Sequence, residues 1–297
     1  MFEQVVKTEH GYYRLKEMRS REELQKYYSG KYYQESKGSY QPSYPEEEKR
    51  YFFNKIEQKF TVATGLIKKP GRDKPHFLDV GCGEGWALKY FKNKAWEVLG
   101  LDYSMFGCKS QNPDCAENVQ VGEIEEKLAT LKGKGECFDV VLLDNVLEHV
   151  LDPLALLELC RAVVSERGVL IVEVPNDFSV LQRHVYEKKY IDRPFWIAKP
   201  DHVSYFDKDG LVSLGNAAGW DCKSLMGDFP IDMNLFNAGT NYVKNPAVGK
   251  DCHRARIEIE NLMHDISLEK VVALYTILAE MGIGRELVAF FQRKGAV

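Results

Sequence analysis

Residues 77–86 read Phe77-Leu78-Asp79-Val80-Gly81-Cys82-Gly83-Glu84-Gly85-Trp86, and this stretch decides the predicted fold. It predicts a short buried strand over residues 76–80, a glycine-rich turn, and a helix that begins at about Trp86. Glycine suits such a turn because it tolerates positive φ and lets a ligand approach the backbone closely. About twenty residues further on, a second apolar run ends in Asp102, the spacing at which an acidic side chain contacts the ribose hydroxyls of a bound nucleoside. The sequence therefore predicts a nucleoside pocket at the carboxyl edge of a parallel sheet.

The spacing of the glycines narrows the choice of nucleoside. A dinucleotide-binding loop has the order G-x-G-x-x-G, with a helix N-terminus that faces a pyrophosphate. Here the glycines at positions 81, 83 and 85 follow Asp79 in the order Asp-x-Gly-x-Gly-x-Gly. This order resembles motif I of the class I S-adenosylmethionine (SAM)-dependent methyltransferases, in which the loop passes around the amino-acid part of SAM and binds no phosphate.

A second motif surrounds the end of the predicted fourth strand. It reads Phe138-Asp139-Val140-Val141-Leu142-Leu143-Asp144-Asn145-Val146-Leu147-Glu148-His149-Val150, and Asp152-Pro153 follows. It is similar to the F-D-x-V…L-E-H-V-x-D-P signature of the branch that contains the ubiquinone-type O-methyltransferases and many small-molecule and sugar methyltransferases. The likeness covers about residues 76–225. It implies a SAM-dependent methyltransferase whose product is S-adenosylhomocysteine (SAH).

Strands and helices alternate regularly after the glycine loop, which predicts an α/β fold with a parallel sheet and helices on both faces. The resemblance implies a doubly wound, mostly parallel sheet of seven strands, the Rossmann-like methyltransferase fold, with the last two strands antiparallel. Further strands are expected at 95–101, 117–121, 137–143, 168–174, 219–229 and 285–292. Helices are expected at 104–110, 123–132, 153–165 and 208–218, with a turn over 165–168.

Three segments outside this alternation complete the predicted organisation. Residues 1–70 form an N-terminal helical, tyrosine-rich cap, with an amphipathic helix over 46–66. The methyltransferase core takes residues 71–229 and 285–297, and the long connection 175–207 serves as a lid because connections of this length are uncommon without a role. A helical insert over 230–284 covers the pocket, binds a partner or forms a homodimer contact; its amphipathic helices alone favour plain packing.

The resemblance also assigns residues to the donor site. Most of them come from the glycine loop and from the ends of the neighbouring strands. They are Asp79, Gly81, Cys82, Gly83, Gly85, Asp102, Tyr103, Glu123, Ile124, Asp144 and Asn145. Glu123 has a second interpretation, as an acidic residue in the first turn of a helix, where the dipole favours it.

Two histidines are candidates for the general base that a hydroxyl acceptor needs, because the pKa of imidazole lies near neutrality. His202 in the lid is preferred over His149, which can instead brace the helix that begins near Pro153. No metal site is predicted. The resemblance implies that some ubiquinone-type enzymes bind a metal through an acid three residues before the L-E-H glutamate, and Asn145 stands at that position here. A metal held by Glu148 and His149 would therefore lack its third carboxylate unless Asp144 substitutes.

Acceptor contacts are expected from the cap and the lid. These residues are Tyr28, Tyr32, Tyr33, Asn176, Asp177, Arg183, Arg193, Trp196 and Tyr205. The tyrosines can equally pack the cap onto the core, and the basic lid residues can equally be a solvated surface. The functional interpretation of both sets is a small polar acceptor, a sugar or a sugar-nucleotide with a phosphate that the lid clamps.

Composition limits the classes of function. The formal net charge of −4 gives no general attraction to nucleic acid or to an anionic membrane. Seven cysteines without a C-x-x-C pair suggest neither a disulfide framework nor a zinc site, which favours the cytoplasm. Neither a signal peptide nor an apolar run of membrane-spanning length is expected. The competing functions are an N-methyltransferase, an NAD(P)-dependent oxidoreductase and a non-catalytic binding protein of the same fold.

Overall fold

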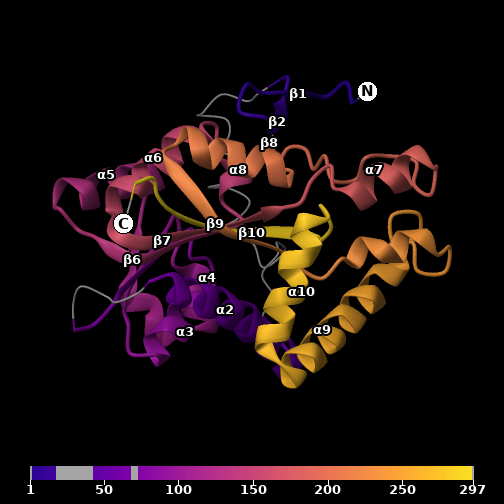
Figure 1. The fold of residues 1–297 in the computed structure, drawn as a ribbon. Helices are drawn as coiled ribbons and strands as arrows, with labels where there is room; N and C mark the ends of the chain where they lie inside the picture. The colour runs from indigo at the N-terminus through magenta and orange to yellow at the C-terminus, as the bar shows by residue number, and fades with distance from the viewer. Residues whose placement is uncertain (1, 18–42, 68–72, 296–297) are drawn as a thin grey trace.

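The computed structural model describes residues 2–17, 43–67 and 73–295, and a seven-stranded sheet runs through its centre (Figure 1). The strand order is β5-β4-β3-β6-β7-β10-β9. Strands β3 to β7 are mutually parallel, and β10 is antiparallel to both of its neighbours. The predicted α/β class, the seven strands and the doubly wound order are therefore confirmed. The strands are β3 (His76–Val80), β4 (Glu97–Asp102), β5 (Val119–Val121), β6 (Phe138–Asp144), β7 (Val164–Pro175), β9 (Trp220–Gly227) and β10 (Glu286–Arg293).

Helices cover both faces of this sheet, as Figure 1 shows. Leu128, Leu156 and Leu211 lie in the core of one face. They belong to α5 (Ile124–Gly133), α6 (Pro153–Val163) and α8 (Lys208–Ala217). The opposite face is covered by α2 (Glu46–Leu66), α3 (Trp86–Asn93) and α10 (Leu268–Glu280), with α4 (Phe106–Gln111) beside them. Short 3₁₀ helices fill the connections: η1 (Pro113–Asn118), η2 (Leu147–His149), η3 (Ile231–Phe236) and η4 (Pro246–Val248).

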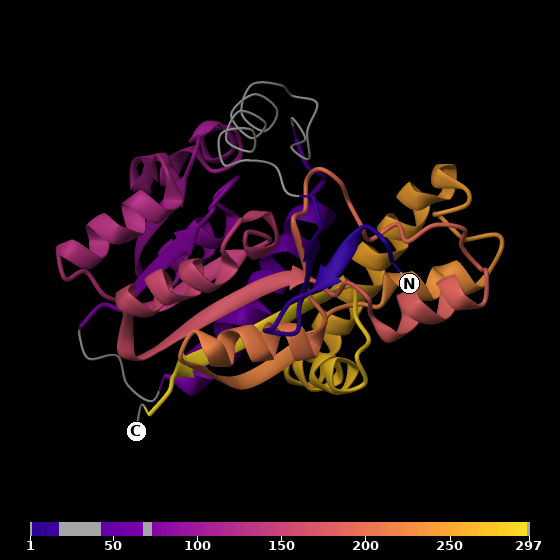
Figure 2. The ribbon, with the colours of Figure 1, turned by 90° about the horizontal axis from the view of Figure 1, so that it is seen from above.

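The N-terminal segment differs from the predicted helical cap. Strands β1 (Val5–Lys7) and β2 (Tyr13–Leu15) form a hairpin, and β2 pairs with β8 (Ser204–Tyr205). Figures 1 and 2 place this hairpin beside α8, where an added Cβ on Gly210 would lie 2.9 Å from Tyr12 Cα. Helix α2, in contrast, has the bounds that the sequence predicts. The expectation of a helical cap was therefore wrong for residues 5–15, because their short alternating runs pair as strands.

Two further predictions needed correction. Residues 165–168 are part of β7 and do not form a turn, since β7 already pairs with β6 from Phe138 and Val164 onward. A shift in register between Phe138 and Val140 absorbs the extra residues. The lid over 175–207 is not wholly irregular, because it contains α7 (Val180–Glu187).

The insert between β9 and β10 is helical, as predicted, and consists mainly of α9 (Gly249–Ile266) and α10. The two ends of the insert lie in contact. A Cβ added to Gly227, where the insert begins, would lie 2.2 Å from the carbonyl oxygen of Ile283, near its end. Asn54 on α2 donates a hydrogen bond of 2.9 Å to Asn261 on α9. The insert therefore packs against the helix that precedes the sheet and extends its helical layer.

Candidate functional site

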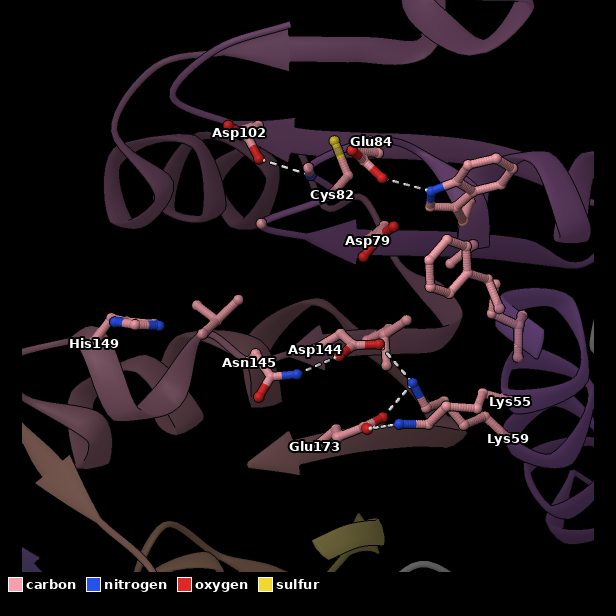
Figure 3. Close-up of a pocket in the computed structure, with 18 of the residues that line it drawn as sticks. Lys55, Lys59, Asp79, Cys82, Glu84, Asp102, Asp144, Asn145, His149 and Glu173 are labelled. Atoms are coloured by element: carbon pink, nitrogen blue, oxygen red, sulfur yellow. Dashed lines mark hydrogen bonds and ion pairs between the residues drawn. The ribbon is translucent and has the colours of Figure 1, made fainter. Parts of the chain in front are cut away.

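A pocket of about 740 Å³ opens at the carboxyl ends of β3, β4 and β6 (Figure 3). In a doubly wound sheet this edge is where ligands bind, because the strand order reverses there. Nine of the predicted donor-site residues line it: Asp79, Gly81, Cys82, Gly83, Asp102, Tyr103, Ile124, Asp144 and Asn145. Gly85 and Glu123 lie outside the lining. Gly85 precedes α3 with φ of 77°, and Glu123 accepts a hydrogen bond of 3.2 Å from the Tyr103 hydroxyl.

The glycine loop is held against the end of β4 by backbone hydrogen bonds. The N–H groups of Gly81 and Cys82 donate to the carbonyl oxygen of Leu101 at 2.7 and 3.1 Å. Gly81 has φ of +78°, and a Cβ there would lie 2.5 Å from Cγ2 of Val146. Only glycine fits this position without displacing its neighbours. The loop is thus a fixed wall of the pocket.

Asp102 connects this loop to the next strand. Its Oδ2 accepts a hydrogen bond of 2.8 Å from the Gly83 N–H, and its Oδ1 accepts one of 2.9 Å from the Ser104 N–H. Burial raises the pKa of Asp102, and these backbone N–H groups act in the opposite direction. The two carboxylate oxygens together offer about four lone-pair sites, more than these backbone N–H groups occupy. The carboxylate is therefore both a brace for the loop and an acceptor for hydroxyl groups.

Asp79 is the second buried acid of the donor pocket. Burial, with the nearby charges of Asp144 and Asp102, raises its pKa well above the usual range, although Lys59 lowers it. A cationic ligand group beside Asp79 would favour the ionised carboxylate. This corner of the pocket is consequently suited to an ammonium group.

Two lysines that the sequence analysis did not single out reach the pocket from α2. Lys59 Nζ lies 2.5 Å from Oδ2 of Asp144 and also pairs with Glu173, while Lys55 Nζ lies 2.8 Å from Oε1 of Glu173 (Figure 3). Burial alone would raise the pKa of Glu173, but both lysines lower it to about 2. Two signals could have identified this network: lysines spaced i, i+4 beside the apolar face of the 46–66 helix, and an acid within the otherwise apolar strand β7.

An aromatic wall, also missed, closes another side. Glu84 accepts hydrogen bonds from the Tyr44 hydroxyl at 2.9 Å and from Trp86 Nε1 at 2.7 Å. Phe52 packs against Trp86 with ring centroids 5.4 Å apart. His253 of α9 also lines the pocket, so the insert contributes to its cover. Flat apolar surfaces of this kind suit a heterocyclic base or a sugar face.

The two candidate histidines lie together, but only His149 lines the pocket. Their ring centroids are 4.9 Å apart, and Nδ1 of His149 lies 2.8 Å from the carbonyl oxygen of Asp201. Burial lowers the pKa of His149, and burial with the charges of His149 and Arg285 lowers the pKa of His202 to about 4. Both rings are therefore neutral near pH 7. The geometry favours His149 for contact with a ligand, whereas the sequence favoured His202.

Glu148 lies beside these rings, with Oε1 3.7 Å from Nε2 of His149. Donor atoms of Glu148, His149 and His202 all lie within 4.8 Å of one another. Among the residues that the structure describes, these three are the group of side chains that could hold a metal ion.

The predicted acceptor residues fall into three sets. Tyr28, Tyr32 and Tyr33 lie outside the described residues. Trp196 and Tyr205 are buried in a hydrophobic cluster with the N-terminal hairpin, and Asn176 and Asp177 are buried behind the pocket lining. Arg183 donates to the carbonyl oxygen of Phe178 at 2.8 Å, and Arg193 to that of Val243 at 3.3 Å. None of these described residues belongs to the pocket lining.

Among the described residues, each helix is too short or too polar to cross a bilayer.

Comparison with known proteins places this geometry in context. A family model described as "Methyltransferase domain" matches residues 49–225, more than half of the chain. A ubiquinone biosynthesis O-methyltransferase from Histophilus somni is 27% identical over 174 residues, covering 56% of this chain and 70% of that protein. One from Cereibacter sphaeroides is 29% identical over 151 residues, covering 48% and 59%.

A solved structure has the same fold. It is a SAM-dependent methyltransferase from Archaeoglobus fulgidus, with a TM-score of 0.50 and 17% identity over 81% of this chain and 94% of that one. At this identity the likeness concerns the fold alone.

Proposed function

The chain belongs to the methyltransferase-domain family, within the class I SAM-dependent methyltransferases, and we propose that it transfers a methyl group to a hydroxyl of a small polar acceptor. The observation that carries the proposal is the 2.8 Å hydrogen bond from the Gly83 N–H to Asp102. It joins the glycine loop to the ribose-binding carboxylate that the resemblance assigns. The matched relatives are named O-methyltransferases, which supports oxygen as the methylated atom.

The donor pocket has groups suited to several parts of SAM. Asp102 would accept hydrogen bonds from the ribose hydroxyls, Asp79 would pair with the ammonium of the methionine part, and Tyr103 and Ile124 would border the adenine. Bound SAM supplies an electrophilic methyl group on a sulfonium. The chain's task is then positioning, which can lower a barrier by roughly 7–11 kcal/mol in the best cases. The fixed glycine loop serves this task because its backbone is already held by Leu101 and Asp102.

His149 is the proposed general base, with His202 behind it. A neutral imidazole at the pocket wall takes the hydroxyl proton as the acceptor oxygen bonds to the methyl carbon and the carbon–sulfur bond breaks. The ring's Nδ1, 2.8 Å from the Asp201 carbonyl oxygen, fixes its orientation. General bases of this kind typically contribute about 10²–10⁴-fold.

The proposed acceptor is a sugar or a nucleotide-linked sugar, which places the enzyme in carbohydrate biosynthesis. Support comes from the aromatic wall of Phe52 and Trp86 and from the polar groups near His149. The aligned stretches span 59–70% of the two relatives described above, so their named substrate is not transferred to this chain. An amine acceptor remains the second candidate because an amine can lose its proton to solvent before binding.

Calorimetry and mass spectrometry test the proposal together. We expect SAH to bind with a one-to-one stoichiometry, and SAM to add one methyl mass to at least one member of a panel of sugars, nucleotide sugars and phenols. Absence of any heat with SAM or SAH, together with clean titration of a pyridine dinucleotide, would overturn it. Binding of SAH without any methylated panel member would contradict the acceptor class and leave the donor site standing.

The organisation of the chain is part of the same proposal. We propose that the described parts of 71–229 and 285–297 form the donor-binding core and that the described parts of 1–70 and the 175–207 lid cover it. The 230–284 insert adds a wall through His253. The seven cysteines are free thiols, which suits the cytoplasm.

A homodimer through α10 completes the proposal. Leu274, Ile277 and Met281 are 41%, 52% and 56% exposed and share one helix face. Antiparallel pairing with a second copy brings the exposed Lys270 opposite the exposed Glu280 of the partner. This self-complementary charge pattern supports a second copy of the chain as the partner. Light scattering of an Ile277→Glu variant should then report a monomer, and an unchanged mass or a monomeric parent protein would refute the pairing.

A further inference from the structure

A cluster of acidic side chains lies behind His149, on the side away from the glycine loop. Glu148 follows β6 and Asp177 follows β7. Glu286 begins β10 and Arg285 directly precedes it, so both lie at the carboxyl edge because β10 is antiparallel to β7. Gln182 of α7 approaches from the lid. We call these five residues, together with His202, the carboxyl cluster.

Geometry and charge both connect these groups, since the donor atoms of Glu148 and His202 lie within 4.8 Å of each other and of His149. Burial raises the pKa of Glu148 well above its usual range, and the charges of Glu286 and Asp177 add to this effect. Burial raises the pKa of Asp177 to about 7, while Arg285 lowers it. Arg285 also lowers the pKa of His202, after burial and His149. The cluster is therefore a single electrostatic unit that reaches the donor pocket through His149.

The hydrogen-bonding capacity of the cluster is largely unused. Glu148, Asp177 and Gln182 are at most 1% exposed. Both carboxylate oxygens of Glu148 lack a hydrogen-bond partner within the described part of the chain. So do Oδ2 of Asp177, Oε1 of Gln182 and Oε2 of Glu286, and one donor nitrogen, Nη1 of Arg285. A buried polar group without a partner costs about 1–3 kcal/mol, so such a concentration implies a polar occupant.

The kinds of unused atoms indicate what that occupant is. Of the seven unused atoms in the cluster, five are oxygens that can accept hydrogen bonds, one is a guanidinium nitrogen that donates, and one is Nδ1 of His202. The neighbouring Asp232 adds a further carboxylate, which already accepts from Gln182 Nε2 at 3.1 Å. Burial favours the protonated carboxyl groups of Glu148 and Asp177, and a positive charge beside them favours the ionised carboxylates, which only accept hydrogen bonds. The occupant that fits the ionised cluster therefore brings mostly donors and a positive charge. A phosphate would bring only acceptors and negative charge.

From this arrangement we infer that the acceptor subsite lies between His149 and the carboxyl cluster, behind the present pocket lining, and selects a polyhydroxylated acceptor that carries a protonated amine. The inference rests on the proposed function and narrows its acceptor class. The ammonium group is a recognition element, because its nitrogen has no lone pair to methylate. A hydroxyl of the same molecule is methylated beside His149. Phosphate recognition by the lid is not needed, since Arg183 and Arg193 bond to backbone carbonyl oxygens outside the pocket lining.

Three sugars of matched size test this inference on the full chain saturated with SAH. Calorimetry should show D-glucosamine binding at least roughly tenfold more tightly than D-glucose, since a charge-assisted hydrogen bond contributes about 1.5–3 kcal/mol. D-Glucose 6-phosphate should bind more weakly than D-glucose. In Asp177→Asn and Glu286→Gln the preference for glucosamine should fall towards one. The control Asp192→Asn, an exposed lid carboxylate, should keep it.

SAH affinity measured for each variant separates this test from the proposed function. Variants that bind SAH normally are folded at the donor site, so a lost sugar preference then belongs to the cluster. Tightest binding by the phosphate, a preference that survives both substitutions, or no binding of any sugar to a protein that binds SAH would overturn the inference. Water alone filling the cluster would give that last result. Loss of SAH binding by the unmodified chain would instead refute the proposed function.

Discussion

Lys59 on α2 and Asp144 at the end of β6 are 85 residues apart in sequence, and Nζ of Lys59 lies 2.5 Å from Oδ2 of Asp144. The same lysine pairs with Glu173 on β7. A helix that precedes the sheet thus supplies the cation between the ends of two central strands. Both carboxylates lie at the edge of the donor pocket, so the pairing affects stability and site geometry together.

Lys59→Met should lower the free energy of unfolding by about 3–5 kcal/mol, because it leaves the buried Glu173 carboxylate without one of its two cations. Urea denaturation followed by circular dichroism measures the loss. Lys49→Met on the same helix removes an exposed pair with Glu46 and should cost less than about 1 kcal/mol. Equal losses in the two variants would show that the buried pair has no special weight.

Asp102→Asn should weaken SAH binding by roughly 10–100-fold, because an amide replaces a charged acceptor whose hydrogen bonds contribute about 1.5–3 kcal/mol. Isothermal titration gives the dissociation constant directly. Asp114→Asn, an exposed carboxylate paired with Lys89, is the matched control and should bind SAH normally. Unchanged affinity in the Asp102 variant would remove this residue from the donor site.

His149→Gln should reduce kcat with a hydroxyl acceptor by about 10²–10⁴-fold and leave SAH affinity unchanged. Burial lowers the pKa of His149 below its ordinary 6.5, so the base is neutral at pH 7 and activity should decline only as pH falls below 6.5. His184→Gln changes an exposed histidine of α7 and should retain full activity. If the His149 variant keeps its rate, proton removal by solvent from an amine acceptor becomes the better account.

Asp177→Asn should raise the free energy of unfolding, and the gain should be about 2 kcal/mol larger at pH 8 than at pH 5. Burial raises the pKa of Asp177 from 3.8 to about 7, so the folded state favours its protonated form. The wild type therefore loses stability as pH rises from about 4 through 7, and the uncharged amide avoids that loss. Denaturation at the two pH values measures the difference. A pH-independent effect would mean that Asp177 is ionised in the folded protein.

Dialysis against EDTA should leave the rate of methyl transfer unchanged. Asn145 stands where some ubiquinone-type enzymes that resemble this chain have an acidic metal ligand. For this reason we expect a reaction that needs no metal. Loss of activity that Mn²⁺ or Zn²⁺ restores would contradict it. In that event Glu148→Gln should abolish the restoration, because Glu148 is one of the three residues whose donor atoms lie within 4.8 Å of one another.

Local sequence patterns were sufficient for the core of the fold. Strand β3 and helix α2 have the predicted bounds because each is specified by its own apolar period. Most of the donor site followed as well, since its residues stand at the ends of strands that the sequence already orders. The N-terminal hairpin was missed because its third strand, β8, lies near residue 204 and cannot be inferred from residues 5–15.

The charged part of the site was less accessible to sequence reasoning. Lys55 and Glu173 are 118 residues apart, and no local period relates them. The choice between His149 and His202 depended on which ring faces the pocket, a matter of packing between the lid and the segment after β6. The carboxyl cluster combines residues of β10, η2, α7 and the lid, so only tertiary structure reveals it.

The contact between Gly227 and Ile283 means that the insert leaves and rejoins the sheet at one point. A segment attached in this way can be shortened, lengthened or exchanged by recombination without altering the order of the strands. The strands that bind the donor would keep their register through such changes. New substrate ranges could therefore evolve on this scaffold by replacement of one module, while the chemistry of the reaction is inherited unchanged.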